Sequence, residues 1–242
     1  MTKRIIVLTG AGISAESGVS TFRDPEGVWA KYDYQQVATP EGFAANPTLV
    51  HEFYNARRGS LDAVEPNPAH IALARLEKEL SAHGGHLTLV TQNVDDLHER
   101  GGAKHVIHMH GELKKARCDA TSAPSCGAVF DWHDDLRVDA QCPVCGATGS
   151  LRPHIVWFGE MPMHMDEIEV ALSKADLFAS IGTSGSVYPA AGYVHAARGL
   201  GIPCIELNLE PSENAAAFND AHYGKAGDIV PLWVDELLSE LD

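Results

Sequence analysis

The sequence predicts an α/β protein built on a parallel sheet, with a smaller lobe inserted into it. Short apolar, β-branched runs recur along the chain, and amphipathic stretches separate them. Strands that are buried on both faces appear as continuous apolar runs, and they are joined by helices that cover both faces of the sheet. Two segments, 34–68 and 112–152, lack this pattern, and we expect them to form the smaller lobe.

Five apolar runs are the expected strands, and they occupy residues 5–8, 87–90, 106–107, 177–181 and 202–207. The stretch 69–80 is expected to be the first connecting helix, because Ile71, Leu73, Leu76 and Leu80 fall on roughly one side of it. The first inserted segment contains a helical pattern at 48–61 and no expected strand.

The composition narrows the class of protein. Of the 242 residues, 45% are hydrophobic and 21% are charged, as in ordinary globular proteins, and the net charge is −15. Such an acidic surface repels phosphate backbones, so we do not expect nucleic acid to be the main ligand. No run approaches the ~20 apolar residues that span a bilayer. Five cysteines without a secretion signal indicate a reducing compartment, and we expect a cytoplasmic protein that binds no membrane.

A glycine-rich turn follows the first expected strand. Gly10, Gly12 and Ala15 have the spacing of Rossmann-like dinucleotide-binding folds, in which backbone N–H groups and a helix N-terminus face a pyrophosphate. A turn without a ligand is the alternative. The acidic residue that this pattern requires about 20 residues later is missing, since the chain there contains Thr21-Phe22-Arg23-Asp24-Pro25. A hydride-transferring dehydrogenase is therefore less favoured.

Two later strand ends could contact the rest of a dinucleotide, because ligands of open parallel sheets bind at the carboxyl ends of the strands. Gly182-Thr183-Ser184 follows the fourth strand and could cradle phosphate or ribose. Asn208-Leu209-Glu210 follows the fifth strand and offers an amide and a carboxylate for the ribose. Polar turns are the alternative at both places.

Polar residues after the second and third strands predict a catalytic centre. Gln92-Asn93-Val94-Asp95 follows the second strand, but Asp96 and Glu99 have capping-box spacing, so this segment could instead cap the next helix. His108 and His110 are expected on one face of the third strand. A histidine at the carboxyl end of a strand can act as a base, because its pKa lies near neutrality. A structural, hydrogen-bonded histidine is the alternative.

Four of the five cysteines lie in the second inserted segment, at positions Cys118, Cys126, Cys142 and Cys145. The second pair has the spacing of a zinc knuckle, whereas the first pair is separated by more than the usual two to four residues. Four thiolates leave no open coordination position, so we expect a structural zinc ion in a segment with little core of its own. Reduced free thiols and disulfides are the alternatives. Cys204 lies in an apolar strand and is expected in the core.

In this order, the motifs resemble those of sirtuins, the NAD-dependent protein lysine deacylases. The resemblance covers essentially the whole chain and rests on Gly10-Ala11-Gly12-Ile13-Ser14, Thr21-Phe22-Arg23, Gln92-Asn93-Val94-Asp95, His110-Gly111, the four cysteines, Gly182-Thr183-Ser184 and Asn208-Leu209-Glu210. The runs Phe53-Tyr54-Asn55-Ala56-Arg57-Arg58 and Val156-Trp157-Phe158-Gly159-Glu160 resemble the bacterial branch that removes acetyl and succinyl groups. Residues 1–242 would then form one sirtuin-type catalytic domain.

The resemblance implies a reaction that consumes NAD. The carbonyl oxygen of an acyl-lysine attacks the ribose carbon that bears nicotinamide, nicotinamide leaves, and the acyl group ends on ADP-ribose. The resemblance implies that His110 is the general base and that Asn93 and Asp95 line the nicotinamide pocket. The other NAD contacts that it implies are Gly10, Ala11, Gly12, Ile13, Ser14, Glu16, Phe22, Arg23, Trp29, Gln92, Val94, Gly182, Thr183, Ser184, Asn208, Leu209, Glu210 and Ala226.

The same resemblance implies a site for an acylated lysine of a protein or peptide. Its residues would be Ala38, Tyr54, Arg57, Val156, Trp157, Phe158, Gly159 and Glu160. Tyr54 and Arg57 lie on one face of an expected helix and would bind the carboxylate of a succinyl group, with a surface aromatic–cation pair as the alternative. An NAD-dependent oxidoreductase and a non-catalytic NAD- or zinc-binding module remain the other functional classes. The oligomeric state stays open, with a monomer as one option.

Overall fold

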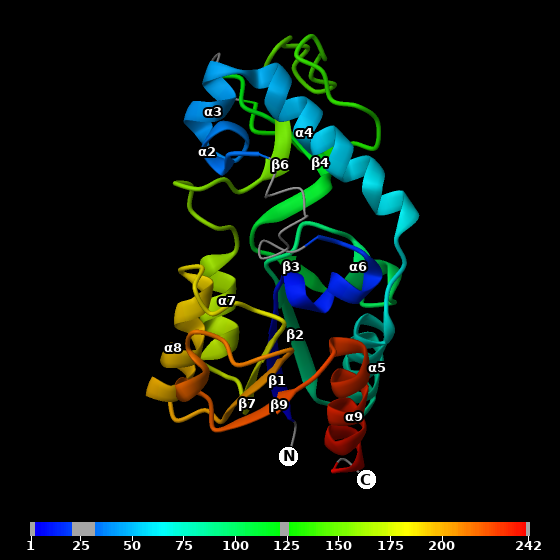
Figure 1. The fold of residues 1–242 in the computed structure, drawn as a ribbon, viewed down its shortest axis with the longest axis vertical. Coiled ribbons are helices and arrows are strands. Elements are labelled where there is room, and N and C mark those ends of the chain that lie inside the picture. Colours follow the sequence, from blue (N-terminus) through cyan, green and yellow to red (C-terminus); the bar gives the residue numbers. More distant parts are fainter. Residues whose placement is uncertain (1–2, 21–31, 122–125, 241–242) are drawn as a thin grey trace.

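The computed structural model describes residues 3–20, 32–121 and 126–240, which form two lobes stacked along the long axis of the molecule (Figure 1). The large lobe contains a six-stranded sheet of order β3-β2-β1-β7-β8-β9, and all of its pairings are parallel. Its strands are β1 (Arg4–Thr9), β2 (His86–Thr91), β3 (Val106–His108), β7 (Leu177–Ile181), β8 (Cys204–Asn208) and β9 (Asp220–Tyr223). The five strands expected from the apolar runs are confirmed, and β9 is an additional edge strand.

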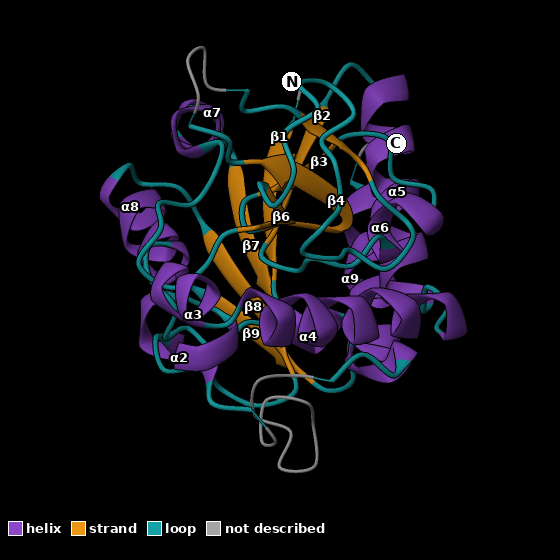
Figure 2. Ribbon diagram, turned by 90° about the horizontal axis from the view of Figure 1, so that it is seen from above, coloured by secondary structure: helices purple, strands orange, loops and turns teal. Residues whose placement is uncertain are grey.

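Helices cover both faces of this sheet, with a hydrophobic cluster on each side. Figure 2 shows α5 (Pro68–Ala82) and α9 (Ala226–Ser239) on one side, and α7 (Met165–Leu172) and α8 (Tyr193–Gly199) on the other. A short helix, α6 (Leu97–Arg100), follows β2. This arrangement confirms the predicted doubly covered parallel sheet.

The helix expected at 69–80 is the central part of α5. Asn67 caps it by accepting a hydrogen bond from the backbone N–H of Ala69, and Pro68 occupies its first turn. Leu73, Leu76 and Leu80 share the buried side of the helix, but Ile71 is 55% exposed, so the prediction that it lies on the same side as these leucines is wrong. Its position lies outside the stripe that the three leucines form at spacings of three and four residues.

The small lobe combines three helices with a second sheet (Figure 1). Within residues 34–68 the structure contains α2 (Tyr34–Val37), α3 (Pro40–Ala45) and α4 (Pro47–Ser60), and no strand. Sheet B is antiparallel, has the order β5-β4-β6, and consists of β4 (Gly111–Cys118), β5 (Val129–Asp131) and β6 (Leu151–Ile155). Aromatic and aliphatic side chains of α4 and β6 share one hydrophobic cluster, which joins the helices to sheet B.

The order of the strands determines where the site lies. From β1 the chain continues to β2, which lies on one side of β1 in the sheet, and it later forms β7 on the other side of β1. The strand order therefore reverses between β1 and β7. The loops that follow these two strands meet at the carboxyl edge of the sheet, which is where parallel α/β sheets bind ligands. None of the described helices has the length and apolar character needed to cross a membrane.

Candidate functional site

Two glycine loops touch each other at the point where the strand order reverses. The backbone N–H of Gly12 donates to the carbonyl oxygen of Gly182 at 2.8 Å, and a Cβ atom on Gly12 would lie 2.7 Å from the Cα atom of Gly182. Gly182 has a φ of +63°, and a Cβ there would lie 2.5 Å from the backbone nitrogen of Ile13. Both positions therefore require glycine, because the two backbones leave no room for a side chain.

The glycine turn is not followed by the regular helix that the dinucleotide motif predicts. Two 3₁₀ helices, Ala11–Ile13 and Ala15–Ser17, occupy this place instead. The N–H groups of Gly10 and Gly12 donate to protein carbonyl oxygens. Among the described residues, the backbone N–H groups of Thr183 and Ser184 have no protein acceptor, so they are available to an anion above the turn.

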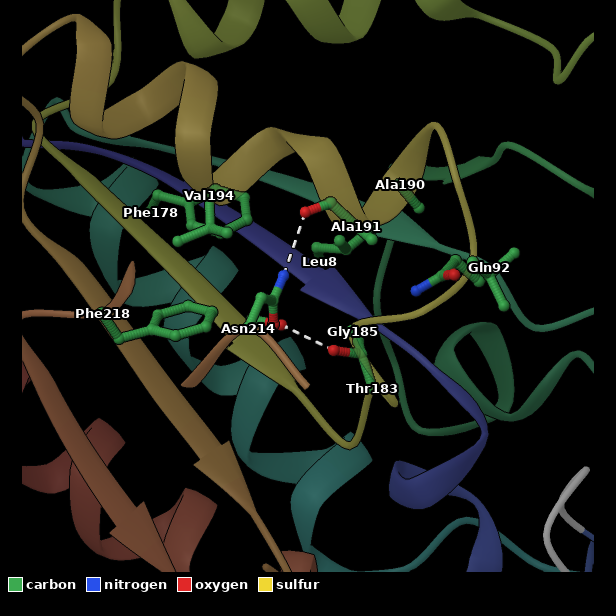
Figure 3. Close-up of a pocket in the computed structure, with 12 residues that line it drawn as sticks. Leu8, Gln92, Phe178, Thr183, Gly185, Ala190, Ala191, Val194, Asn214 and Phe218 are labelled. Atoms are coloured by element: carbon green, nitrogen blue, oxygen red, sulfur yellow. Dashed lines mark hydrogen bonds between the residues drawn. The ribbon is translucent and has the colours of Figure 1, made fainter. Parts of the chain in front are cut away.

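A small pocket beside this loop explains how Thr183 is held (Figure 3). The hydroxyl groups of Ser180 and Thr183 lie 2.9 Å apart, and the side chain of Asn214 donates to the carbonyl oxygen of Ala191 at 3.0 Å. The pocket has a volume of about 10 Å³, which is room for about one water molecule. Gln92 also lines it. This space supports the loop and is too small to hold a nucleotide.

Buried polar side chains meet above the ends of β1 and β2. The Oγ atom of Ser14 accepts a hydrogen bond from the amide of Asn93 at 3.0 Å and donates to the carboxylate of Asp95 at 3.1 Å. The other carboxylate oxygen of Asp95 accepts from the backbone N–H of Leu97 at 3.2 Å. Burial raises the pKa of Asp95, and these hydrogen bonds oppose the shift. Ser14 therefore fixes Asn93 and Asp95 relative to each other.

Asp95 also binds the first backbone N–H group of the helix that follows, α6. Asp96 occupies the N-cap position of α6 but makes no side-chain capping bond, and its carboxylate instead binds the ammonium of Lys114 at 2.9 Å. The backbone N–H of Leu97 is satisfied by Asp95. The capping box of Asp96 and Glu99 that the spacing allows is therefore absent from the described structure.

His110 has one ring nitrogen, Nε2, without a hydrogen-bond partner among the described residues. Its Nδ1 atom lies 3.1 Å from the carbonyl oxygen of Gln92. Because a carbonyl only accepts, Nδ1 must carry the proton, and the lone pair is on Nε2. Burial lowers the pKa of His110, which the hydrogen bond to Gln92 partly opposes, so the ring is neutral near pH 7. A neutral imidazole with a free Nε2 can accept a proton from a hydroxyl.

The sequence predicted that His108 and His110 share one face of a strand, and this prediction is wrong. Strand β3 ends at His108, and His110 lies in the turn before β4. The Nε2 atom of His108 lies 2.7 Å from the carboxylate of Glu99, and this contact, which opposes the effect of burial, contributes to a raised pKa of His108. The pairing joins β3 to α6, and no motif pointed to it because it depends on tertiary contact.

The end of β8 and the residues after it form the polar turn that the sequence left open as an alternative, and this turn contacts the loop after β7. The amide of Asn208 donates to the carbonyl oxygen of Thr183 at 2.8 Å. Leu209 is 70% exposed, and Glu210 follows it at the surface. At the neighbouring edge, the carboxylate of Glu16 accepts from the backbone N–H of Gly227 at 2.7 Å. This contact places Glu16 at the first turn of α9, next to Ala226.

Tyr54 and Arg57 form a partly enclosed pair on α4. Tyr54 is 1% exposed, and the guanidinium carbon of Arg57 lies 5.9 Å from its ring centroid. Burial lowers the pKa of Arg57, while the charges of Tyr54 and Asp95 oppose this shift. The surface aromatic–cation pair considered from the sequence is therefore wrong, because Tyr54 is buried.

The segment after β6 runs between the two lobes. The backbone N–H of Val156 donates to the carbonyl oxygen of His110, and that of Phe158 donates to the carbonyl oxygen of the buried Ala38, both at 2.9 Å. Trp157 is 2% exposed, whereas Phe158 is 44% exposed. Gly159 has a φ of +90°, which suits glycine in the turn that follows.

The carboxylate of Glu160 is fully engaged within the protein. It accepts two hydrogen bonds from the guanidinium of Arg152, at 2.7 and 2.9 Å, and one from the backbone N–H of Trp157 at 2.8 Å. These contacts, which oppose the effect of burial, lower the pKa of Glu160. Glu160 therefore holds the segment in shape through these contacts.

The four cysteines of the small lobe converge on one point. The sulfur atoms of Cys118, Cys126, Cys142 and Cys145 all lie within 4.8 Å of one another. Two of the separations are 3.8 and 3.7 Å, and tetrahedral zinc with bonds of about 2.3 Å requires sulfur atoms about 3.8 Å apart. The wide spacing of the first pair is thus compatible with a four-thiolate zinc site. Cys204 is buried in β8, as predicted.

The structure leaves part of the expected site untested. Phe22, Arg23 and Trp29, which the resemblance assigns to the cofactor, lie outside the described residues. The remaining expected residues divide between the carboxyl edge of the large sheet and the segments that join the lobes. The arrangement combines a neutral base, a buried amide–carboxylate pair and free backbone donors.

Comparisons with known proteins identify the family of the chain. The Sir2 family model matches residues 10–189. The chain is 58% identical to the NAD-dependent protein deacylase of Caulobacter vibrioides over 98% of both chains, and 55% identical to that of Pasteurella multocida over 98% of this chain and 100% of the relative. The alignment with a solved Sir2 homolog–NAD complex covers 99% of this chain and 91% of the chain in that complex, with a TM-score of 0.85 and 37% identity. The chain therefore belongs to the Sir2 family.

Proposed function

We propose that this protein is an NAD-dependent protein lysine deacylase that removes both acetyl groups and acidic acyl groups such as succinyl. One water molecule would be consumed with the acyl-lysine and NAD, and the products would be nicotinamide, O-acyl-ADP-ribose and free lysine. NAD would supply the glycosidic bond that breaks and the ribose that receives the acyl group. The observation that carries the proposal is the neutral imidazole of His110, whose Nδ1 atom is held by the carbonyl oxygen of Gln92, the residue next to Asn93 in the buried network of Asn93, Ser14 and Asp95.

The residues divide the work between proton transfer and orientation. His110 accepts a proton from a ribose hydroxyl at Nε2, while its bond to Gln92 keeps the proton on Nδ1. Asn93 and Asp95 line the nicotinamide pocket in an orientation that Ser14 fixes. Breaking the glycosidic bond builds positive charge on the ribose, and buried dipoles stabilise such charge strongly.

The loop after β7 binds the phosphates in this proposal. Thr183 and Ser184 offer backbone N–H groups without protein acceptors among the described residues, and Gly10 and Gly12 allow the two loops to approach. Asn208 and Glu210 lie at the adenosine end. The other residues that we assign to the cofactor site are Ala11, Ile13, Glu16, Phe22, Arg23, Trp29, Gln92, Val94, Gly182, Leu209 and Ala226.

An acyl-lysine enters between the lobes in this proposal. Val156, Trp157 and Phe158 provide an apolar wall, and Gly159 leaves the backbone open to an extended peptide. Tyr54 and Arg57 bind the carboxylate at the end of a succinyl group, and the small Ala38 leaves space near them. Glu160 supports this wall through Arg152. The four thiolates hold zinc, and a reducing compartment such as the cytoplasm keeps them available.

The direct experiment uses two peptides of one sequence, one acetylated and one succinylated on the same lysine. Each is incubated with the protein, with and without NAD, and mass spectrometry detects bare lysine and acylated ADP-ribose. We expect both products only with NAD, together with free nicotinamide and no NADH absorbance. Untouched peptides would overturn the deacylase proposal, and NADH formation would favour an oxidoreductase.

The acyl preference is tested with Arg57→Met, which keeps the length of the side chain and removes its charge. A hydrogen bond to a charged group contributes about 1.5–3 kcal/mol. We therefore expect the ratio of kcat/KM for the succinyl peptide to kcat/KM for the acetyl peptide to fall about 10- to 100-fold. An equal loss on both peptides would reject Arg57 as the ligand of the carboxylate.

A further inference from the structure

The ion pair of Arg152 and Glu160 contacts Trp157 at two places, the face of its indole ring and its backbone N–H. The guanidinium carbon of Arg152 lies 3.2 Å from the centroid of the Trp157 ring, and Arg152 is only 3% exposed. Glu160 binds the same guanidinium twice and also accepts the backbone N–H of Trp157. Arg152 donates a further hydrogen bond to the carbonyl oxygen of Ile155 at 2.9 Å. The indole therefore has one fixed orientation.

The fixed indole makes its polar contact with Tyr54. Its Nε1–H donates to the Oη atom of Tyr54 at 3.0 Å, and both side chains are almost completely buried. An indole N–H can only donate, so the tyrosine oxygen must be the acceptor in this bond. The hydroxyl proton of Tyr54 consequently points elsewhere, and no acceptor for it is present among the described residues.

The hydrogen bond from Trp157 limits the direction in which the hydroxyl group of Tyr54 can donate its proton. A buried donor without an acceptor is unfavourable, so such a proton indicates the position of an acceptor on a ligand. Arg57 lies on the same helix, with its guanidinium carbon 5.9 Å from the Tyr54 ring. In the proposed function the carboxylate of a succinyl group binds both side chains. An acetyl group, which ends in a methyl, offers no acceptor there.

We propose that Trp157 is a positioning residue for acyl specificity: its indole N–H occupies the oxygen of Tyr54 and directs the hydroxyl proton of Tyr54 toward the carboxylate of an acidic acyl group. The proposal rests on the proposed deacylase function. Arg152 and Glu160 act one step further away, by holding the indole. Donation into the tyrosine oxygen also strengthens the hydrogen bond that the hydroxyl makes in turn, because linked hydrogen bonds polarise one another.

The test is Trp157→Phe, which keeps an aromatic ring and removes the N–H. The readout is the ratio of kcat/KM for the succinyl peptide to kcat/KM for the acetyl peptide, in which any packing effect common to both substrates cancels. One neutral hydrogen bond contributes about 0.5–1.5 kcal/mol, so we expect the ratio to fall about 3- to 10-fold. An unchanged ratio would overturn the proposal.

Tyr54→Phe supplies the second arm. If Trp157 acts through the hydroxyl of Tyr54, the two substitutions are not independent, and adding Trp157→Phe to Tyr54→Phe should lower the ratio no further. Fully additive effects on the logarithm of the ratio would contradict the proposal, because Trp157 would then act by another route.

Trp132→Phe is the matched control. Trp132 lies in the small lobe, and its indole nitrogen is buried without a hydrogen-bond partner among the described residues. This substitution should leave the ratio unchanged. A fall equal to that of Trp157→Phe would mean that loss of any buried indole alters the ratio, which would also overturn the proposal.

Failure of this inference can be distinguished from failure of the proposed function. If Arg57→Met lowers the ratio and Trp157→Phe does not, the acidic-acyl site stands and the role of Trp157 is wrong. If neither peptide is deacylated by the unmodified protein, the proposed function itself fails.

Discussion

The large lobe and the cysteine-bearing segment 112–152 are stabilised in different ways. In the large lobe, two clusters of buried apolar side chains fill both faces of the parallel sheet. The cluster in the cysteine segment contains five buried residues, and two of these, Cys118 and Cys142, are expected zinc ligands. Burial of apolar surface stabilises the first region, whereas the second is too small to fold on that basis alone.

This difference assigns the metal a structural role at a distance from the chemistry. The cysteines belong to the small lobe, while His110, Asn93 and Asp95 lie at the carboxyl edge of the large sheet. Zinc would influence the reaction through sheet B, since β4 begins directly after His110 and β6 leads to Trp157. Substitutions in the cysteine segment should therefore change mainly the zinc content, and substitutions in the large lobe mainly the global free energy of unfolding.

The largest expected effect is the loss of the metal. Cys142→Ser removes one of four thiolates, and structural zinc sites contribute about 10–16 kcal/mol to the folding of small domains. We expect bound zinc to fall from about one ion per chain to nearly none. Hydrogen exchange should then lose its protection in 112–152, while β1 and β7 stay protected.

Cys204→Ser is the matched control, because Cys204 is buried in β8 of the large lobe and away from the four clustered sulfurs. This variant should keep its zinc. A Cys142→Ser protein that retains full metal content and unchanged exchange would show that the cysteine segment does not depend on zinc, and the comparison would break down.

A smaller loss of stability is expected when a substitution creates a cavity in the core of the large lobe. Leu76→Ala removes a fully buried side chain of α5 and should lower the free energy of unfolding by about 2–5 kcal/mol, measured by denaturant titration. Leu136→Ala removes an equally buried leucine from the cysteine segment. There we expect the main change in zinc retention and local exchange, with a smaller shift of the global midpoint. Equal global shifts would argue that the two regions unfold as one unit.

The smallest expected effect is acid sensitivity of the large lobe through His70. Burial lowers the pKa of His70 to about 4, below its ordinary value near 6.5. Between these values the unfolded chain binds a proton that the folded protein does not. Stability is therefore lost as the pH falls through this window, by about 2 kcal/mol between pH 7 and pH 5. Denaturant titrations at the two pH values measure the loss.

Protonation of the buried ring would also break a hydrogen bond that His70 makes. Its Nδ1 atom accepts the backbone N–H of Asn67, and protonation would remove this acceptor. His70→Asn keeps an acceptor near the same place without titrating, so it should flatten the pH dependence. His83→Asn, at the exposed end of the same helix, should leave the dependence unchanged. A slope unaffected by His70→Asn would exclude His70 as its source.

Much of the large lobe could be predicted because its strands are buried on both faces. Continuous apolar runs identified β1, β2, β3, β7 and β8. Strand β9 (Asp220–Tyr223) was missed because Asp-Ala-His-Tyr is a polar, half-exposed edge strand without such a run. The cysteine segment was predicted as a metal site from its ligands, but its three-stranded sheet was not, since short strands around a metal need little apolar periodicity.

The candidate site could be predicted in its residue types and less well in its contacts. Strand ends brought His110, Asn93 and Asp95 to one edge, as parallel topology requires. By contrast, no pattern predicted that Glu160 is bound by Arg152, 8 residues earlier in the chain. That pairing depends on how β6 and the following turn fold back on each other. Spacing in the sequence does not encode such a contact.

The contact between Gly12 and Gly182 limits how this protein can be redesigned. Their backbones are separated by less than the width of a methyl group, although the two residues belong to loops that are far apart in the chain. An engineer who wishes to change the nucleotide preference cannot graft a foreign loop after β1 alone, because the opposing loop would collide with it. Both loops would have to be exchanged as one matched unit.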